Sequence, residues 1–385
     1  MPSNRHPEAS ASPKSDGASS AETIVCVEAF LARLARLVFW CWVQIKQQVP
    51  LAPLTTFKVG GPARYFVEAH SEEDVRAAVA EAQSRDWPLF VLGGGSNLVI
   101  SDAGWPGLVL KIGLQGIDTR RDGPRMLFEA AAGEDWDGFV AHTIACDCAG
   151  IECLSGIPGT VGGTPVQNVG AYGQEVSETI ISLRALDTSS GEFCELENAD
   201  SGFAYRTSIF NREHGRYIVL RVTFALVPGG TPRIEYADLK GYFAGSSGPP
   251  NLMETRDAVR AIRLSKAMLI VPGDDDCRSA GSFFKNPLLT RRAFEQLQAR
   301  GSAVPSFPTK DGMVKVAAAW LVEHAGFHKG LTRGPVGISR RHALALVNRG
   351  GATAADIIAL KDEIQKRVLE QFGVELQPEP VFVGF

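Results

Sequence analysis

The glycine-rich tract GIPGTVGGTPVQNVGAYG, residues 156–173, most limits what this chain can fold into. Glycine accepts positive φ and proline fixes φ, so together they specify a shaped backbone that keeps many N–H groups free. Such a backbone suits a diphosphate and a flat polar ring, and Gln167 and Asn168 add amide groups. A linker needs none of these features, and we predict that the tract binds a ligand.

A second glycine turn lies between two predicted strands in LFVLGGGSNLVIS, residues 89–101. The N–H groups of Gly93, Gly94 and Gly95 can converge on an anion, although a structural tight turn also explains these glycines. An apolar strand follows rather than a helix, and Leu98 replaces the last glycine of G-x-G-x-x-G, so the dinucleotide fingerprint is not met. Two glycine loops in one α+β domain predict a long dinucleotide such as FAD.

Composition narrows the function classes further. The 385 residues are enough for two or three domains, and a net charge of -4 gives little support for a nucleic-acid or membrane-surface partner. Seven scattered cysteines are typical of a reducing compartment. Cys146, Cys148 and Cys153 lack the partners of a tetrahedral zinc site, and His324 and His328 lack the glutamate of H-E-x-x-H. We therefore predict no metal site.

Residues 1–49 are predicted to be an extension. Residues 1–22 are rich in Ser, Ala and Pro and are expected to be disordered. Residues 23–48 are apolar, but Glu28, Arg33 and Arg36 interrupt them, so an amphipathic or accidental helix is favoured over a membrane span. We expect translation to begin near Val43.

The remainder alternates short strands and helices and predicts an α+β protein. Ser71 and Asp74 have the spacing of a capping box, as do Thr353 and Asp356 before the last long helix. The sequence GGTP at 229–232 marks a boundary between domains at 50–230 and 231–385. The final segment PVFVGF is predicted to be a strand that returns to the first domain.

Six motifs in order resemble the UDP-N-acetylenolpyruvoylglucosamine reductase family over residues 50–385. They are LTTFKVGGPA, LGGGSNLVISD, GIPGTVGGTPVQNVGAYG, FAYRTSIF, AGSFFKNP and LQPEPVFVG. The resemblance implies a two-lobed FAD-binding domain of the vanillyl-alcohol-oxidase type and a C-terminal α+β substrate-binding domain. It also implies a monomeric cytoplasmic oxidoreductase of peptidoglycan precursor synthesis, and hence of cell-wall biogenesis, cell shape and cell division. Such an enzyme reduces an enolpyruvyl ether of a nucleotide sugar to a lactyl ether, with NADPH as the hydride donor and FAD as the carrier.

The resemblance assigns catalytic roles to Arg206, Ser282 and Glu379. Arg206 and Glu379 would stabilise the enolate-like charge next to the substrate carboxylate, and Ser282 would donate a proton to carbon. Phe283 and Phe284 are expected to exclude water. Without the resemblance, Arg206 fits a structural ion pair, Ser282 a turn and Glu379 a solvated loop.

Binding residues follow from the same motifs. Noncovalent FAD is expected at Gly93, Gly94, Gly95, Ser96, Asn97, Gly156, Gly159, Gly163 and Gly170. The nucleotide sugar is expected at Tyr236, Arg263, Lys266 and Asn286. Two alternatives remain at this point: an FAD-dependent oxidase on the same fold, and a catalytically inactive nucleotide-sugar-binding protein.

Overall fold

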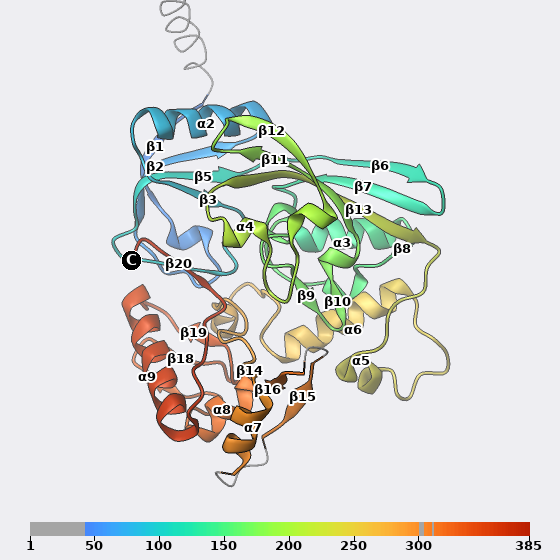
Figure 1. Ribbon diagram of the computed structural model, residues 1–385, viewed down its shortest axis with the longest axis vertical. Coiled ribbons are helices and arrows are strands. Elements are labelled where there is room, and N and C mark those ends of the chain that lie inside the picture. Colours follow the sequence, from blue (N-terminus) through green and yellow to red (C-terminus); the bar gives the residue numbers. More distant parts are fainter. Residues whose placement is uncertain (1–42, 300–303, 310–311) are drawn as a thin grey trace, which may run out of the picture. The chain divides into compact units, whose positions relative to one another are not determined.

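A mixed four-stranded sheet opens the described part of the chain (Figure 1). The computed structural model describes residues 43–299, 304–309 and 312–385. The sheet has the order β1-β2-β5-β3, formed by β1 (Lys46–Pro50), β2 (Pro62–Ala69), β5 (Trp105–Ile112) and β3 (Leu89–Leu92). Helix α2 (Glu72–Ser84) connects β2 to β3 and begins with the predicted Ser71–Asp74 capping box.

An antiparallel sheet follows and supports the glycine tract. Its main path has the order β12-β11-β13-β7-β6, and β8 pairs with β13. The strands are β6 (Ile117–Asp122), β7 (Arg125–Ala131), β8 (Cys148–Ala149), β11 (Ile180–Asp187), β12 (Glu192–Glu197) and β13 (Tyr217–Pro228). Helix α3 (Trp136–Ala145) packs on this sheet, where the rings of Phe139 and Phe224 lie 5.0 Å apart.

The carboxy-terminal half, residues 231–385, surrounds a large apolar core. Its elements are α5 (Ala237–Tyr242), α6 (Leu252–Ser265), β14 (Leu288–Leu289), α7 (Arg291–Gln298), β15 (Ser306–Pro308), β16 (Val314–Val316), α8 (Ala318–His324), β17 (Thr332–Arg333), β18 (Val336–Ile338), β19 (Leu346–Asn348) and α9 (Ala354–Phe372). Helix α9 buries Ile357, Leu360 and Ile364, and it has the predicted Thr353 cap. Phe57 and Val99 from the amino-terminal half join this core.

Short strands and helices lie in the connections between the longer elements. They are η1 (Ala52–Leu54), β4 (Leu98–Ile100), η2 (Glu152–Leu154), η3 (Val161–Gly163), β9 (Gly170–Ala171), β10 (Gln174–Glu175), η4 (Val176–Glu178), η5 (Asn198–Ser201), α4 (Ile209–Arg212), η6 (Asp275–Cys277) and β20 (Val381–Val383).

The last strand, β20, leaves the carboxy-terminal half and runs back toward the amino-terminal strands (Figure 1). There it pairs in parallel with β4. Val381 is opposite Leu98, and Val383 is opposite Ile100. Strand β4 directly follows the Gly93–Asn97 turn, so this pairing brings the residues just before β20 to that turn.

The helix predicted over residues 23–48 needs correction at its end. Residues 1–42, and with them the predicted disorder and most of that helix, lie outside the described residues. Lys46–Pro50 forms strand β1 because its backbone pairs with β2, from Lys46–Phe66 to Pro50–Pro62. Among the described residues, no helix is both long and apolar enough to span a bilayer.

Candidate active site

A cavity of about 510 Å³ brings together most of the site residues predicted from the sequence. Its walls include Gly93, Gly94, Gly95, Ser96, Asn97, Gly159, Gly163, Gly170, Arg206, Tyr236, Arg263, Lys266, Ser282, Asn286 and Glu379. Gly156 lines a neighbouring cavity of about 720 Å³, which shares Gly93, Gly94 and Gly159 with the first. The two glycine loops therefore contribute to the walls of both cavities.

The two glycine loops approach each other backbone to backbone. A Cβ atom on Gly94 would lie 2.5 Å from Gly159 Cα, and one on Gly95, at φ +63°, would lie 2.0 Å from Leu54 O. Neither position has room for a side chain. Thr160 Oγ1 is buried there with no hydrogen-bond partner among the described residues. This close contact, together with the unpaired hydroxyl, fits the diphosphate of a dinucleotide.

Arg206 is held in an unusual backbone conformation at the cavity. Its φ of +54° is disfavoured for a residue with a Cβ, and the Ala204–Thr207 bridge closes the turn around it. Its Nη2 donates to Gly170 O at 2.8 Å, and its Nε lies 3.2 Å from Glu379 Oε1. The Nε group is buried but makes no hydrogen bond among the described residues, because its geometry toward Glu379 is poor. A donor thus remains for an anionic ligand.

Glu379 is fixed through its backbone from three directions. Its N–H donates to Phe283 O at 2.9 Å, and its carbonyl accepts from Asn97 Nδ2 at 3.2 Å and Gln167 Nε2 at 3.4 Å. Both glycine loops therefore position this residue. Burial raises the pKa of the Glu379 carboxyl, while the charges of Arg206 and Lys285 oppose that rise.

The phenylalanines after Ser282 anchor its loop. Phe283 and Phe284 are 0% and 1% exposed and belong to the carboxy-terminal core. Phe283 N donates to Leu344 O at 2.8 Å, and Gly281, at φ +72°, precedes the serine. Ser282 therefore lines the cavity from a loop whose following residues are buried in the core.

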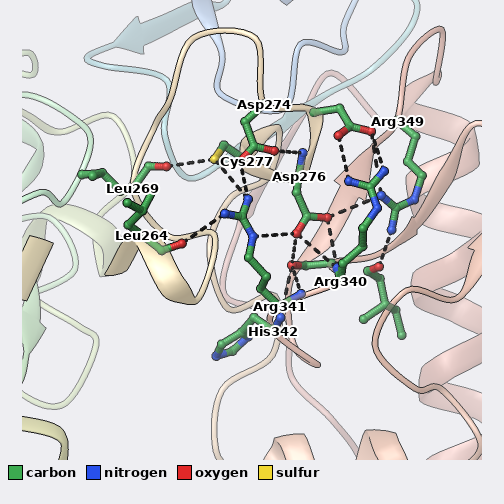
Figure 2. A network of polar contacts seen from close by, with 12 residues as sticks. Leu264, Leu269, Asp274, Asp276, Cys277, Arg340, Arg341, His342 and Arg349 are labelled. Carbon is green, nitrogen blue, oxygen red and sulfur yellow. Dashed lines mark hydrogen bonds and ion pairs between the residues drawn. The ribbon is translucent and has the colours of Figure 1, made fainter. Parts of the chain in front are cut away.

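A network of charges holds the segment before Ser282 (Figure 2). Asp276, whose side chain is 1% exposed, accepts from Ser339 Oγ at 2.7 Å and from Arg340 N at 3.1 Å. It also lies 3.3 Å from Arg341 Nε and 3.4 Å from Arg349 Nη1. The neighbouring Asp274 pairs with Arg341, so Asp274 and Asp276 belong to one ionic network with Arg341.

Arg263 and Lys266, the two positively charged residues predicted to bind the substrate, both bind other protein groups in the structure. Arg263 Nε donates to Gly156 O at 2.9 Å and its Nη2 to Met268 O at 2.6 Å, and burial lowers its pKa. Lys266 forms an ion pair with Asp238. Both side chains face the cavity, but each already has a protein partner.

The two uncharged substrate candidates also line the cavity. Tyr236 immediately precedes helix α5 and contacts Tyr172 edge to face, with ring centroids 5.5 Å apart. Asn286 Oδ1 accepts from Ala318 N at 2.9 Å, which caps helix α8. The carbonyl oxygen of Asn286 is therefore committed to the protein.

Thr160 and His342 are among the polar residues of the cavity that sequence reasoning missed. Thr160 is one threonine within the glycine tract, and His342 is a single histidine beside an apolar run. Neither belongs to a motif whose spacing would have indicated a site residue. His342 Nδ1 accepts from Leu344 N at 3.2 Å, which leaves its Nε2 to carry the proton of the neutral ring. Burial, together with the charges of Lys266 and Lys329, lowers the pKa of His342 to about 4.

Comparisons with known proteins agree over most of the chain. The family description "UDP-N-acetylenolpyruvoylglucosamine reductase, C-terminal domain" matches residues 272–383, and "FAD binding domain" matches residues 63–197. The UDP-N-acetylenolpyruvoylglucosamine reductase of Streptomyces coelicolor is 48% identical over 354 residues, covering 89% of this chain and 91% of the relative. That of Thermobifida fusca is 44% identical over 348 residues, covering 88% and 98%.

A solved structure of UDP-N-acetylenolpyruvylglucosamine reductase from Thermus caldophilus is also similar. It has 25% sequence identity and a TM-score of 0.60, and the match covers 89% of this chain and all of that one. The predicted α+β fold class is thus confirmed, with an FAD-binding domain followed by a C-terminal domain of the reductase family.

Proposed function

Since the chain belongs to the UDP-N-acetylenolpyruvoylglucosamine reductase family and contains an FAD-binding domain, we propose that it reduces UDP-N-acetylglucosamine enolpyruvate to UDP-N-acetylmuramate with NADPH. The observation that supports this most directly is that Arg206, Ser282 and Glu379 line one cavity beside both glycine loops. The reaction belongs to peptidoglycan precursor synthesis, and we expect a monomer acting in the cytoplasm.

The two cavities together suit a long dinucleotide. Gly93–Asn97 and Thr160 would hold the FAD pyrophosphate, and the tract from Gly159 to Gly170 would lie beside the flavin. When bound, FAD would supply the hydride-transfer chemistry between NADPH and the terminal carbon of the enolpyruvyl double bond. No residue is assigned to a covalent link, and we expect acid to release free flavin.

Arg206 and Glu379 would bind the enolpyruvyl carboxylate. The unbonded Nε of Arg206 is a charge-assisted donor, and Glu379 has a raised pKa that favours its protonated form at a buried site. A protonated Glu379 donates a hydrogen bond to the same carboxylate. Both groups then stabilise the negative charge that grows as hydride arrives at the neighbouring carbon.

Ser282 would complete the reduction by protonating the carbon that bears the ether oxygen. One hydride at the terminal carbon and one proton at its neighbour convert the enolpyruvyl group to a lactyl group, so the reaction balances. A hydroxyl is a weak acid, but an enolate carbon is strongly basic and accepts its proton. Ser282 therefore needs no triad.

The nucleotide part of the substrate would lie toward the α5–α6 side of the cavity. Tyr236, Arg263, Lys266 and Asn286 all face it. Because Lys266 pairs with Asp238, the substrate diphosphate would compete with that carboxylate for the ammonium group. Tyr236 is 46% exposed, so its ring is accessible to a ligand.

An anaerobic titration tests the proposal. We expect NADPH to bleach the visible flavin band of the purified protein, and UDP-N-acetylglucosamine enolpyruvate to restore it with formation of UDP-N-acetylmuramate. Bleaching without recovery would refute the substrate. A protein that binds no added FAD would refute the role of both glycine loops.

A further inference from the structure

The hydroxyl of Thr56 joins the two walls of the active-site cavity. Thr56 Oγ1 donates to Ser279 O at 2.6 Å, and Thr56 N donates to Gly95 O at 3.0 Å. Ser96 O lies 3.3 Å from the same hydroxyl. Thr56 belongs to the motif LTTFKVGGPA, to which the proposed reaction assigns no role. One side chain thus connects the glycine turn to the loop that carries Ser282.

These contacts orient peptide groups toward the cavity. In a trans peptide the N–H points opposite to the C=O, so a carbonyl bound to Thr56 directs the next N–H away from Thr56. The next residues are Ser96 and Ala280, and both line the cavity. Within the described part of the chain, neither amide donates to another protein group. The contacts of Thr56 therefore direct two backbone N–H groups, those of Ser96 and Ala280, toward the cavity, where a ligand could accept from them.

The Ser279–Phe283 segment is held at both ends. Thr56 binds Ser279 O, and Leu344 O binds Phe283 N at 2.8 Å. Between them, Ser279 Oγ accepts from Gly281 N at 3.2 Å. Ser282 lies next to that turn, so a shift of Ser279 would be transmitted to it.

We propose that Thr56 is a positioning residue, whose hydroxyl sets the separation between the Gly93–Asn97 turn and the Ser282 loop. The inference rests on the proposed reduction, in which hydride transfer and proton donation require the flavin, the substrate and Ser282 to be aligned. We therefore expect that loss of the Thr56 hydroxyl slows reoxidation of the flavin by the substrate but not reduction of the flavin by NADPH.

The test compares Thr56→Val, Thr56→Ser and Thr55→Val in the full chain. Valine keeps the shape and backbone N–H of Thr56 but removes its hydroxyl, while serine retains the hydroxyl. Thr55 is the matched control because it is 2% exposed and its hydroxyl serves the local turn, accepting from Lys58 N at 3.1 Å. The hydrogen bonds that Asn348 donates to Phe57 O and Arg278 O involve neither threonine side chain and remain in every variant.

We expect Thr56→Val to slow substrate-driven flavin reoxidation about 10- to 100-fold, as misplacement of a reacting group does. Flavin content and reduction by NADPH should stay at wild-type levels. Thr56→Ser should restore the rate, and Thr55→Val should leave the ratio of the two half-reactions unchanged. Equal loss in both half-reactions, loss of FAD, or an unchanged Thr56→Val would overturn the proposal.

Hydrogen exchange separates this inference from the proposed function. Thr56→Val should speed amide exchange of the Ser279–Phe284 segment, whereas Thr55→Val should not. Unchanged exchange would overturn the tether even if activity fell. If the wild-type flavin is reduced by NADPH but never reoxidised by UDP-N-acetylglucosamine enolpyruvate, the proposed function is wrong. Amide hydrogen exchange still decides whether Thr56 holds the Ser279–Phe284 segment.

Discussion

Arg206 Nε lies 3.2 Å from Glu379 Oε1, although the two residues come from opposite halves of the chain. Glu379 reaches this position because β20 pairs with β4, and Arg206 reaches it through a turn at φ +54°. A strained backbone persists where its surroundings over-determine it, here through the Ala204–Thr207 bridge and the bond to Gly170 O. This turn places at the cavity a buried N–H group that makes no hydrogen bond among the described residues.

Replacing Arg206 separates the backbone strain from the side-chain function. Both Arg206→Ala and Arg206→Gly should lower substrate-driven reoxidation about 100- to 1,000-fold, since each removes the donor that we propose to stabilise the developing charge. Arg206→Gly should nevertheless unfold at higher urea, with a free energy of unfolding about 0.5–1 kcal/mol above that of Arg206→Ala, because glycine accepts positive φ. Arg212, in helix α4, is the control, and there alanine should be the more stable replacement. Equal stability of the two Arg206 variants would contradict the strain.

The pH dependence of reoxidation should report on Glu379. Burial raises the pKa of this carboxyl, so its protonated form extends to higher pH than that of an ordinary glutamate. If the protonated form binds the substrate carboxylate, the reoxidation rate falls as pH rises through this raised pKa. We expect Glu379→Gln, which keeps a donor, to retain part of the rate and to lose this limb of the stopped-flow pH profile. The exposed Glu375→Gln should keep it, and a Glu379→Gln profile identical to wild type would contradict the role.

The same carboxyl links folding to pH with a definite sign. A folded-state pKa above the unfolded value means that the folded protein binds more protons between the two values. The contribution of Glu379 to stability is therefore present below the unfolded pKa and is lost as pH rises through the folded pKa. Urea unfolding across that window should show this loss in the wild type but not in Glu379→Gln.

Ser282→Ala should separate the two half-reactions. NADPH should still bleach the flavin at the wild-type rate, because in the proposed reaction the hydroxyl acts only after hydride reaches the substrate. Reoxidation should fall about 100- to 10,000-fold, the range for loss of a general acid. Ser265, whose hydroxyl bonds Ile262 O on the exposed side of α6, provides the alanine control. A proton-donor role would be ruled out if both half-reactions slowed equally.

Gly94→Ala should damage FAD binding directly. A Cβ at Gly94 would lie 2.5 Å from Gly159 Cα, so the two backbones must separate. We expect FAD affinity to drop by at least about tenfold, since the proposed pyrophosphate donors lie on both loops. Gly241→Ala, in helix α5, should bind FAD normally, because no atom of the described residues lies within 4 Å of the added Cβ. Comparable affinities, measured by fluorescence titration, would show that the loops tolerate separation.

Local patterns predicted much of the fold. The Ser71 and Thr353 caps and the two glycine loops depend on residues close in sequence, and each was found where predicted. Long-range pairing was harder to read from sequence. Lys46–Gln48 was predicted to end a helix but belongs to strand β1, because its conformation is decided by pairing with β2.

The same limit applies to the site. Motifs identified Arg206, Ser282 and Glu379 as candidates, but no local pattern shows that Arg206 Nε would be left without a hydrogen bond. Likewise, the pairing of Lys266 with Asp238 depends on how α5 packs beside α6. Partners distant in sequence are set by packing, whereas the motifs specify only residue types and spacing.

The ionic network in Figure 2 should make Asp276 far more important for stability than its neighbour Asp275. Asp276 is buried and contacts Arg341 and Arg349, so Asp276→Asn removes the buried carboxylate that these two guanidinium groups share, although Arg341 keeps Asp274 as a partner. Loss of one partner of a buried pair should lower the free energy of unfolding by about 3 kcal/mol. Asp275 pairs with the more exposed Arg340, and Asp275→Asn should change stability by less than about 1 kcal/mol. Urea unfolding of both variants at neutral pH checks this, and equal effects would show that burial of Asp276 does not strengthen the network.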